Sequence, residues 1–178
     1  MPVQFHTPRL LIREFAPGDE ADVHEYASDP EVVRFMPWGP NTPEQSRQFF
    51  DRRLAPHPDP RWEFELAIVL KSEEKVVGGV GLRIRNFTHR EGDIGYVLNR
   101  RYWNRGIITE AARAMLDFGF GDLGLHRIYA TCDPENRGSA RVMEKLGMKY
   151  EGHLRQNVFE KGRWRDTLLY AILESDPR

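Results

Sequence analysis

The sequence predicts a single α/β domain of the α+β type, built around a mainly antiparallel sheet. Residues 62–98 contain three strand-like runs separated by short turns, which is typical of an antiparallel meander. Two later stretches each pair a strand-like run with a helix-like run, and the last part of the chain reads as a terminal hairpin. A length of 178 residues suits one domain, which we place at 1–178.

The early part of the chain predicts one strand and three short helices. Residues 7–15 are rich in β-favouring side chains, and helices are expected at 20–27 and 29–36. A third helix begins after Thr42, because the Thr42 hydroxyl and the Gln45 side chain can form a capping box. These helices precede the meander and should pack against it.

The meander consists of strands expected at 62–70, 76–85 and 93–98. In the first strand, apolar residues recur at a period of two. Three glycines lie within residues 78–81 and weaken the middle strand locally. We therefore expect a bend there, or the close approach of another backbone.

The second half predicts two strand–helix units and a hairpin. The strand at 93–98 leads through a loop to a helix that presents one apolar stripe, formed by Ile108, Ala111, Ala112, Met115 and Phe118. A strand at 126–132 leads to a helix that ends at Leu146, before Gly147. The final hairpin consists of strands at 148–158 and 163–173.

Composition restricts the classes of function. The formal net charge is -1, from 26 basic and 27 acidic residues, so no global field attracts nucleic acid or an anionic membrane. Cys132 is the single cysteine, so no intrachain disulfide can form, and a buried apolar role is expected for it. We find no signal peptide and no apolar run of about 20 residues, and expect a cytoplasmic protein.

The loop between the two elements at 93–98 and 108–118 is the most informative stretch. Asn104 and Gly106 allow a tight backbone where the chain enters the helix. Several backbone N–H groups at such a helix start have no partner and point the same way, which favours an anion such as a diphosphate. The alternative is a plain connection with nothing bound.

This loop resembles a known family. Trp103-Asn104-Arg105-Gly106-Ile107-Ile108 is similar to the acyl-CoA pyrophosphate loop of the GNAT acetyltransferase superfamily. With Ile94-Gly95-Tyr96 and Thr109-Glu110-Ala111 it resembles the Rim-type branch, which acetylates the N-termini of ribosomal proteins. Ile108 stands where the family pattern has Gly or Ala.

A second segment strengthens the resemblance. Residues 133–148 resemble the GNAT pattern Asn-x-x-Ser-x-x-x-x-x-Lys-x-Gly-Phe, with Met148 in the Phe position, about thirty residues after the loop. The resemblance implies a GNAT fold, with a central, mostly antiparallel mixed sheet of six to seven strands flanked by about four to five helices. It also implies acetyl-CoA as co-substrate.

The resemblance assigns the acetyl-CoA contacts. Backbone groups of the 96–98 strand would pair with the pantetheine arm and hold the thioester oxygen. Asn136 would bond the arm and Ser139 would lie near the sulfur, although Asn136 is also a good N-cap and Ser139 could be a surface residue. The implied contacts are Tyr96, Val97, Leu98, Asn104, Arg105, Gly106, Ile107, Ile108, Thr109, Asn136 and Ser139.

Two residues are candidates for catalysis. Met143 stands where the superfamily often has a tyrosine that protonates the leaving thiolate, so Ser139 is the nearest remaining proton donor; the alternative is that acid catalysis is weak or absent. Asp93, which matches a Glu of Rim-type sequences, would take the amine proton directly or through water, or it is a solvated strand-end residue. Weaker alternatives for the base are Glu63, Glu65 and His89.

The six histidines show no metal-ligand spacing, so no metal is expected.

The acceptor is expected to be a primary amine, either a protein N-terminus or a small molecule. Loop aromatics would form its pocket, or else pack over the core edge: Trp38, Phe87 and Trp103. The amine would attack the thioester directly in a ternary complex, in a monomer or homodimer that binds neither nucleic acid nor membrane. One alternative is an acyl-CoA-binding sensor that has lost turnover. A Rossmann-like nucleotide binder is poorly supported, because the strands from Gly78 to Leu98 look antiparallel and not parallel with helical crossovers.

Overall fold

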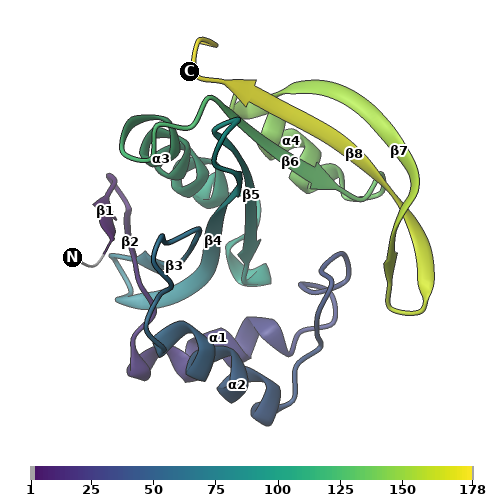
Figure 1. Cartoon of the computed structure of the whole chain (residues 1–178). Coiled ribbons are helices and arrows are strands. Elements are labelled where there is room, and N and C mark those ends of the chain that lie inside the picture. The colour runs from purple at the N-terminus through teal and green to yellow at the C-terminus, as the bar shows by residue number, and fades with distance from the viewer. Residues whose placement is uncertain (1–2, 178) are drawn as a thin grey trace.

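The computed structural model describes residues 3–177 and consists of one open, mixed sheet with helices on both faces (Figure 1). The eight strands are β1 (Gln4–His6), β2 (Leu10–Arg13), β3 (Glu63–Leu70), β4 (Lys75–Asn86), β5 (Glu91–Leu98), β6 (Arg127–Cys132), β7 (Lys149–Glu160) and β8 (Arg163–Leu173). The α-helices are α1 (Glu20–Ala27), α2 (Pro43–Leu54), α3 (Ile107–Gly121) and α4 (Arg137–Lys145). The spatial order of the strands is β1-β2-β3-β4-β5-β6-β8-β7.

The predicted architecture is confirmed, with two local differences. The chain before α1 forms a hairpin of two strands because the Thr7 hydroxyl turns the chain by accepting from Leu10 N–H, which raises the strand number to eight. Residues 29–36, expected as a helix, form turns instead. There the backbone forms only two isolated turn bonds, from Val33 N–H to Asp29 O at 3.2 Å and from Met36 N–H to Val33 O at 3.0 Å, and no continuous helical series.

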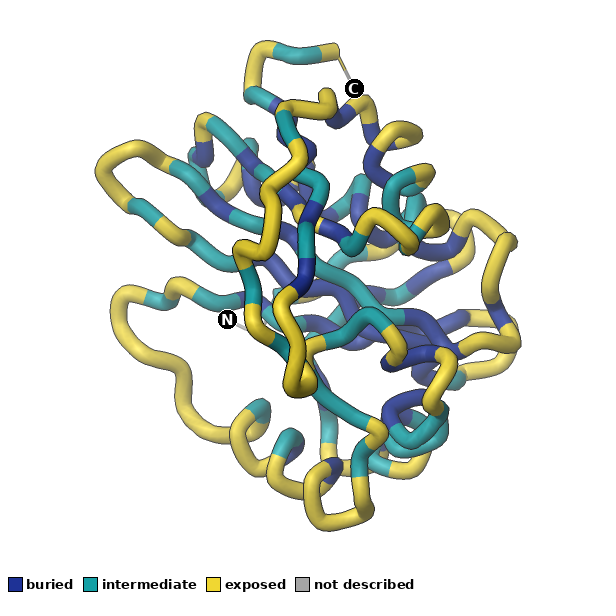
Figure 2. Tube along the Cα trace, turned by 90° about the vertical axis from the view of Figure 1, so that its right-hand side faces the viewer, coloured by how far each residue is buried: buried dark blue, intermediate teal, exposed yellow. Residues whose placement is uncertain are grey.

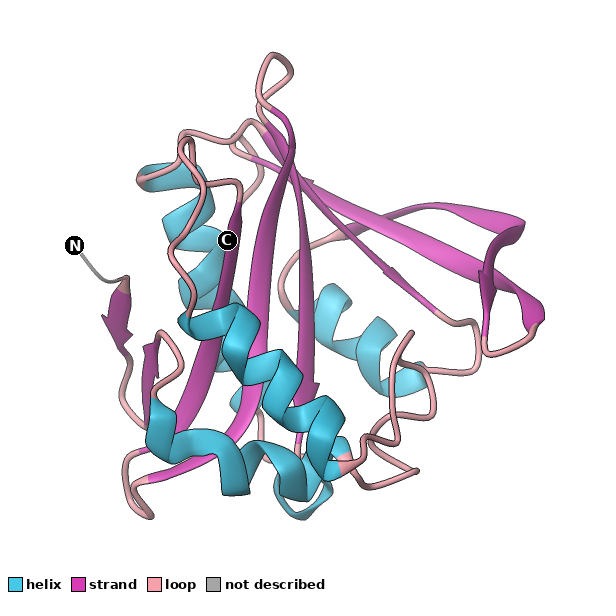
Figure 3. Ribbon diagram, turned by 60° about the horizontal axis from the view of Figure 1, so that its bottom comes forward, coloured by secondary structure: helices cyan, strands magenta, loops and turns pink. Residues whose placement is uncertain are grey.

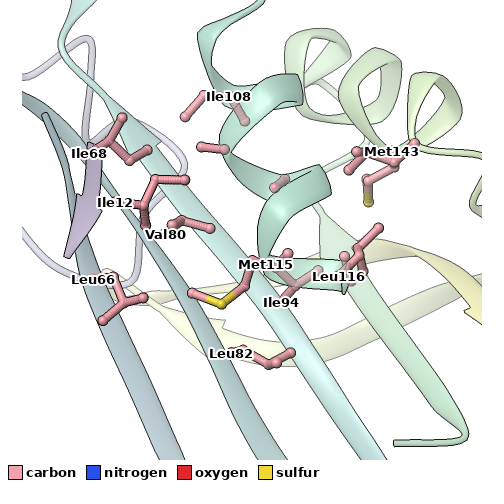
Figure 4. Packing of buried hydrophobic residues seen from close by; sticks show 14 of the residues in the cluster. Ile12, Leu66, Ile68, Val80, Leu82, Ile94, Ile108, Met115, Leu116 and Met143 are labelled. Atoms are coloured by element: carbon pink, nitrogen blue, oxygen red, sulfur yellow. The ribbon is translucent and has the colours of Figure 1, made fainter. Parts of the chain in front are cut away.

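The sheet separates two hydrophobic cores. On one face, β2–β6 pack against α3 and α4, and Figure 4 shows Leu66, Ile68, Val80 and Leu82 facing Met115 of α3. On the other face, α1 and α2 cover a smaller core. The central strands carry most of the buried residues, whereas the outer loops are exposed (Figure 2).

The parallel pair β5–β6 is where the sheet opens. These strands pair only from Glu91↔Arg127 to Asp93↔Tyr129 and then diverge. Figure 3 shows the C-terminal strands leaning away from the rest of the sheet. The divergence leaves a slot between residues 94–98 of β5 and residues 130–132 of β6.

Candidate active site

A cavity of about 1280 Å³ surrounds this slot and reaches both faces of the sheet. It is lined from the α1–α2 side by residues such as Phe15 and Glu65, and from the α3–α4 side by residues such as Ile108 and Ser139. Most of the site residues expected from the sequence line it: Trp38, Asp93, Tyr96, Val97, Leu98, Trp103, Asn104, Gly106, Ile107, Ile108, Thr109, Asn136 and Ser139. The cavity is therefore large enough to hold two substrates together.

The loop before α3 has the tight backbone that the sequence predicts. Gly106 is the N-cap with φ of 72°, and Asn104 is also left-handed, with φ of 61°. The N–H of Glu110 is the first to bond within the helix, to Gly106 O at 3.1 Å. Within residues 3–177, the N–H groups of residues 107–109 donate to no backbone carbonyl outside the helix. This helix start can therefore bind an anion.

Arg9, which the sequence did not indicate as part of the site, anchors this loop from β1–β2. Its guanidinium donates to Arg105 O at 2.8 Å and pairs with Glu110 at 2.7 Å. The Thr7 hydroxyl also donates to Glu110, at 2.6 Å. Burial alone would raise the pKa of Glu110, but the hydrogen bonds from Thr7 and Arg9 outweigh it and lower this pKa. A charged carboxylate thus fixes the first turn of α3.

The side chains of the loop divide between the core and the surface. Ile108 is 8% exposed and packs in the core, and it also lines the cavity (Figure 4). The Trp103 indole donates to Leu98 O at 2.8 Å. Arg105 does not line the cavity, and its guanidinium lies over the Tyr102 ring at 5.4 Å.

The slot exposes the backbone edge of β5. Residues 94–98 pair with β4 on one side, and residues 130–132 of β6 pair with β8 on their far side. Between them no strand pairing continues past Asp93↔Tyr129. Backbone groups of β5 that face the slot are therefore available to an extended ligand, as buried peptide groups need partners.

The start of α4 brings Asn136 and Ser139 to the cavity. Asn136 is the N-cap of α4, as expected from the sequence, since its Oδ1 accepts from Ser139 N–H at 3.1 Å. The Ser139 hydroxyl lies 3.0 Å from the Tyr96 hydroxyl, which also donates to Ser139 O at 3.2 Å. Burial raises the pKa of Tyr96. Met143 is fully buried and supplies no polar group.

Asp93 lies in an ion-pair network on the face covered by α1 and α2. Its side chain is 15% exposed, one oxygen pairs with Arg85, and the other lies 3.5 Å from Arg83 Nη1. Both oxygens are therefore engaged by arginines.

Of the alternative bases, only Glu65 lies in the cavity with a raised pKa. Burial raises the pKa of Glu65, although Arg83 approaches it at 3.2 Å. Burial would also raise the pKa of Glu63, but hydrogen bonds from Arg53 and Arg83 outweigh this and lower it. His89 lies in the β4–β5 turn and does not line the cavity.

Phe87 does not lie in the expected acceptor pocket. It is 55% exposed in the β4–β5 turn and does not line the cavity. This turn lies at the Glu91 end of β5, whereas the loop before α3 follows the Leu98 end. Eight residues of strand separate the two ends by roughly 25 Å. Trp38 and Trp103 do line the cavity.

Cys132 is buried, as the sequence predicts, and burial raises the pKa of its thiol to about 11. Among residues 3–177, no three His, Cys, Asp or Glu side chains are grouped as metal ligands. No helix in that part of the chain is long and apolar enough to span a membrane.

Known proteins match this chain along most of its length. A family model described as "Acetyltransferase (GNAT) domain" matches residues 9–149. An uncharacterized N-acetyltransferase of Bacillus subtilis, YnaD, is 38% identical over 170 residues, which cover 96% of each chain.

Solved structures agree with this match. The crystal structure of a GNAT-family acetyltransferase from Bacillus anthracis has a TM-score of 0.86 and 38% identity, over 98% of this chain and all of the other. A ribosomal-protein-S5-alanine acetyltransferase from Vibrio fischeri has a TM-score of 0.81 and 28% identity, over 98% of each chain.

Proposed function

The chain belongs to the GNAT family of acetyl-CoA-dependent N-acetyltransferases, and we propose that it acetylates a primary amine by direct attack within a ternary complex. The proposal rests on the slot between β5 and β6, which connects the α3 helix start to the carboxylates on the opposite face. One cavity can therefore bring an acyl donor and an amine together.

We assign the donor to the α3–α4 side. Backbone N–H groups of residues 104–109 would bind the diphosphate, and the edge of residues 96–98 that faces the slot would pair with the pantetheine arm. The Asn136 amide nitrogen has no partner among the described residues and would bond the same arm. Arg105 would contribute little, because its side chain lies outside the cavity.

The protein would assist two proton transfers. An amine is mostly protonated near neutral pH, so a carboxylate has to take a proton before attack. Asp93 remains one candidate for this base and Glu65 is the other. Ser139, with Tyr96 beside it, would supply a proton or a hydrogen bond to the departing sulfur. Backbone N–H groups of the β5 edge would stabilise the negative charge on the thioester oxygen.

The charges around the acceptor favour an amine with a single positive charge. Three carboxylates on this sheet face, Glu63, Glu65 and Asp93, are each paired with an arginine. They leave no row of unneutralised acids for the further ammonium groups of a polyamine. We therefore propose a protein N-terminus or a small monoamine. The likeness to the Vibrio fischeri ribosomal-protein-S5-alanine acetyltransferase supports the first of these.

A thiol-release assay with acetyl-CoA and a panel of amines tests this function. The panel contains short peptides with different free N-termini, the same peptides acetylated at the N-terminus, small monoamines and spermidine. We expect turnover with a free peptide N-terminus or a monoamine, less with spermidine, and none with the blocked peptides.

Two outcomes would contradict the proposal. Preferential turnover of spermidine would overturn the acceptor class. A rise in melting temperature with acetyl-CoA, without turnover of any amine, would instead favour an acyl-CoA-binding module.

A further inference from the structure

We propose that Glu65, and not Asp93, is the general base that deprotonates the acceptor amine. This inference rests on the proposed function and refines it. It follows from the position of Glu65 in the sheet, from the open space beside it and from the point at which the slot begins.

Glu65 extends sideways across the neighbouring strand. The register of the sheet places Glu65 of β3, Gly81 of β4 and Gly95 of β5 in one row. A Cβ atom on Gly81 would lie 2.5 Å from Glu65 Oε2 and 2.9 Å from Oε1. The carboxylate therefore lies directly over the Gly81 backbone, and only glycine permits this.

The next position in the row is open. A Cβ atom on Gly95 would meet nothing within 4 Å, and Gly95 lines the cavity. Neighbouring strands lie about 4.8 Å apart, so the space above Gly95 is roughly one strand spacing from the Glu65 carboxylate. An amine standing there is within reach of this carboxylate on one side and of the slot on the other.

Asp93 lies in the preceding row of the sheet, before the slot begins. Its row contains Glu63 and Arg83, and at this level β5 still pairs with β6, through Asp93↔Tyr129. The slot opens only beyond that pair, at the level of Gly95. Asp93 also has both oxygens on arginines, so it is better placed to hold Arg83 and Arg85 than to receive a proton.

The surroundings of Glu65 make its carboxylate a stronger base than an exposed one. Its side chain is 19% exposed, and burial raises its pKa. The charged and titratable groups that face it are Arg83 of β4, Arg53 of α2, Asp93 of β5, Tyr26 of α1 and Glu63 of its own strand. A carboxylate with a raised pKa accepts a proton more readily than an ordinary one.

The protons balance as follows. The Glu65 carboxylate takes one proton from the ammonium group, and the free electron pair on nitrogen forms the C–N bond to the thioester carbonyl. The C–S bond then breaks, its electron pair goes to sulfur, and the second proton lost by nitrogen ends on the thiol. Glu65 releases its proton to solvent through the cavity. One ammonium and one thioester thus give one amide, one thiol and one proton.

The test compares Glu65→Gln with Asp93→Asn in pH–rate profiles with the best amine of the panel. We expect Glu65→Gln to lower turnover by about 10²–10⁴-fold near neutral pH, the usual contribution of a general base. The ratio of wild-type to variant rate should rise with pH through the pKa of Glu65 and shrink where the amine is deprotonated without help. Asp93→Asn should keep the wild-type profile shape.

Further variants separate this role from the ion-pair network. Glu63→Gln removes a carboxylate of the same strand that also pairs with Arg83, and should keep the profile shape. Gly81→Ala displaces the Glu65 carboxylate without removing it, and should lower turnover while acetyl-CoA still raises the melting temperature. In the free protein, a ¹³C NMR titration should assign a raised pKa to the carboxyl group that Glu65→Gln removes.

The outcomes are distinct. If the wild-type protein turns over and Glu65→Gln has the same pH–rate profile, Glu65 is not the general base, but the proposed function stands. If Asp93→Asn instead loses the pH dependence of the wild-type rate, Asp93 is the general base. Absence of turnover in the wild-type protein with every amine would overturn the proposed function and the base together. If Glu65→Gln does not fold, Gly81→Ala decides: full turnover in that variant would overturn the proposal.

Discussion

The pair formed by Ser139 and Tyr96 shows how neighbours determine what a single residue can do. A serine hydroxyl alone is a poor acid. Here it lies 3.0 Å from the hydroxyl of Tyr96, on the strand that borders the slot. The Tyr96 side chain could not be assigned this role from the sequence, because 43 residues separate it from Ser139. The two hydroxyls can act as one unit at the departing sulfur.

We expect Ser139→Ala and Tyr96→Phe each to lower turnover by at most about 10²-fold, the lower end of general-acid catalysis. The double variant should be little slower than the slower single variant, because two residues that act as a unit are not additive. Turnover and acetyl-CoA affinity are to be measured for all three. A change in affinity alone would mean that Ser139 only lines the pocket.

At the scale of elements, the loop and first turn of α3 form a unit that is only partly encoded locally. Asn104 and Gly106 could be identified from the sequence, because left-handed backbone favours these residue types. Arg9 could not, because it reaches this loop from 96 residues away. The position of Ile108 in the core likewise depends on how α3 packs on the sheet.

Gly106→Val should raise the KM for acetyl-CoA about tenfold, which corresponds to roughly 1.4 kcal/mol. The branched side chain is strained at a φ of 72° and crowds the helix start. Gly124→Val is a matched control, since Gly124 is also left-handed, with φ of 62°, but lies outside the cavity. We expect Gly124→Val to lower the free energy of unfolding and to leave the KM for acetyl-CoA unchanged. An unchanged KM in Gly106→Val would exclude this loop as the diphosphate site.

At the scale of the whole molecule, the sequence predicted most of the elements but not which residues meet. The meander and the two strand–helix units were predictable because their hydrophobic periods and turns are local. The row of Glu65, Gly81 and Gly95 depends on the register of three strands, which no local pattern specifies. Phe87 was misplaced for a related reason, since loop aromatics reveal nothing about the end of the sheet on which they lie.

Glu65 should also reduce the stability of the folded protein near neutral pH. The pKa of Glu65 is raised in the folded state. Its contribution to the free energy of unfolding is therefore present below the unfolded pKa of about 4.3 and is lost as pH rises through the folded pKa. Glu65→Gln should therefore raise the melting temperature more at about pH 8 than at about pH 4. A gain on the order of 1 kcal/mol corresponds to about 2–4 °C.

Glu63→Gln gives the control of opposite sign. The folded-state pKa of Glu63 is lowered, so its stabilising contribution is present above the unfolded pKa and is lost as pH falls. This variant should lower the melting temperature at about pH 8 and have less effect at about pH 4. Melting curves that shift in the same direction for both variants would show that the environment of Glu65 does not disfavour its charge.

The slot between β5 and β6 has a consequence for the order of events in a catalytic cycle. Its cavity is lined from both faces of the sheet, by Ser139 and Ile108 on one side and by Phe15 and Glu65 on the other. In the proposed complex, a donor at the α3 helix start and an amine above Gly95 would approach from opposite directions, and neither would lie in the path of the other. Steric exclusion would then impose no compulsory order of binding, and each product could depart through the face by which its precursor arrived.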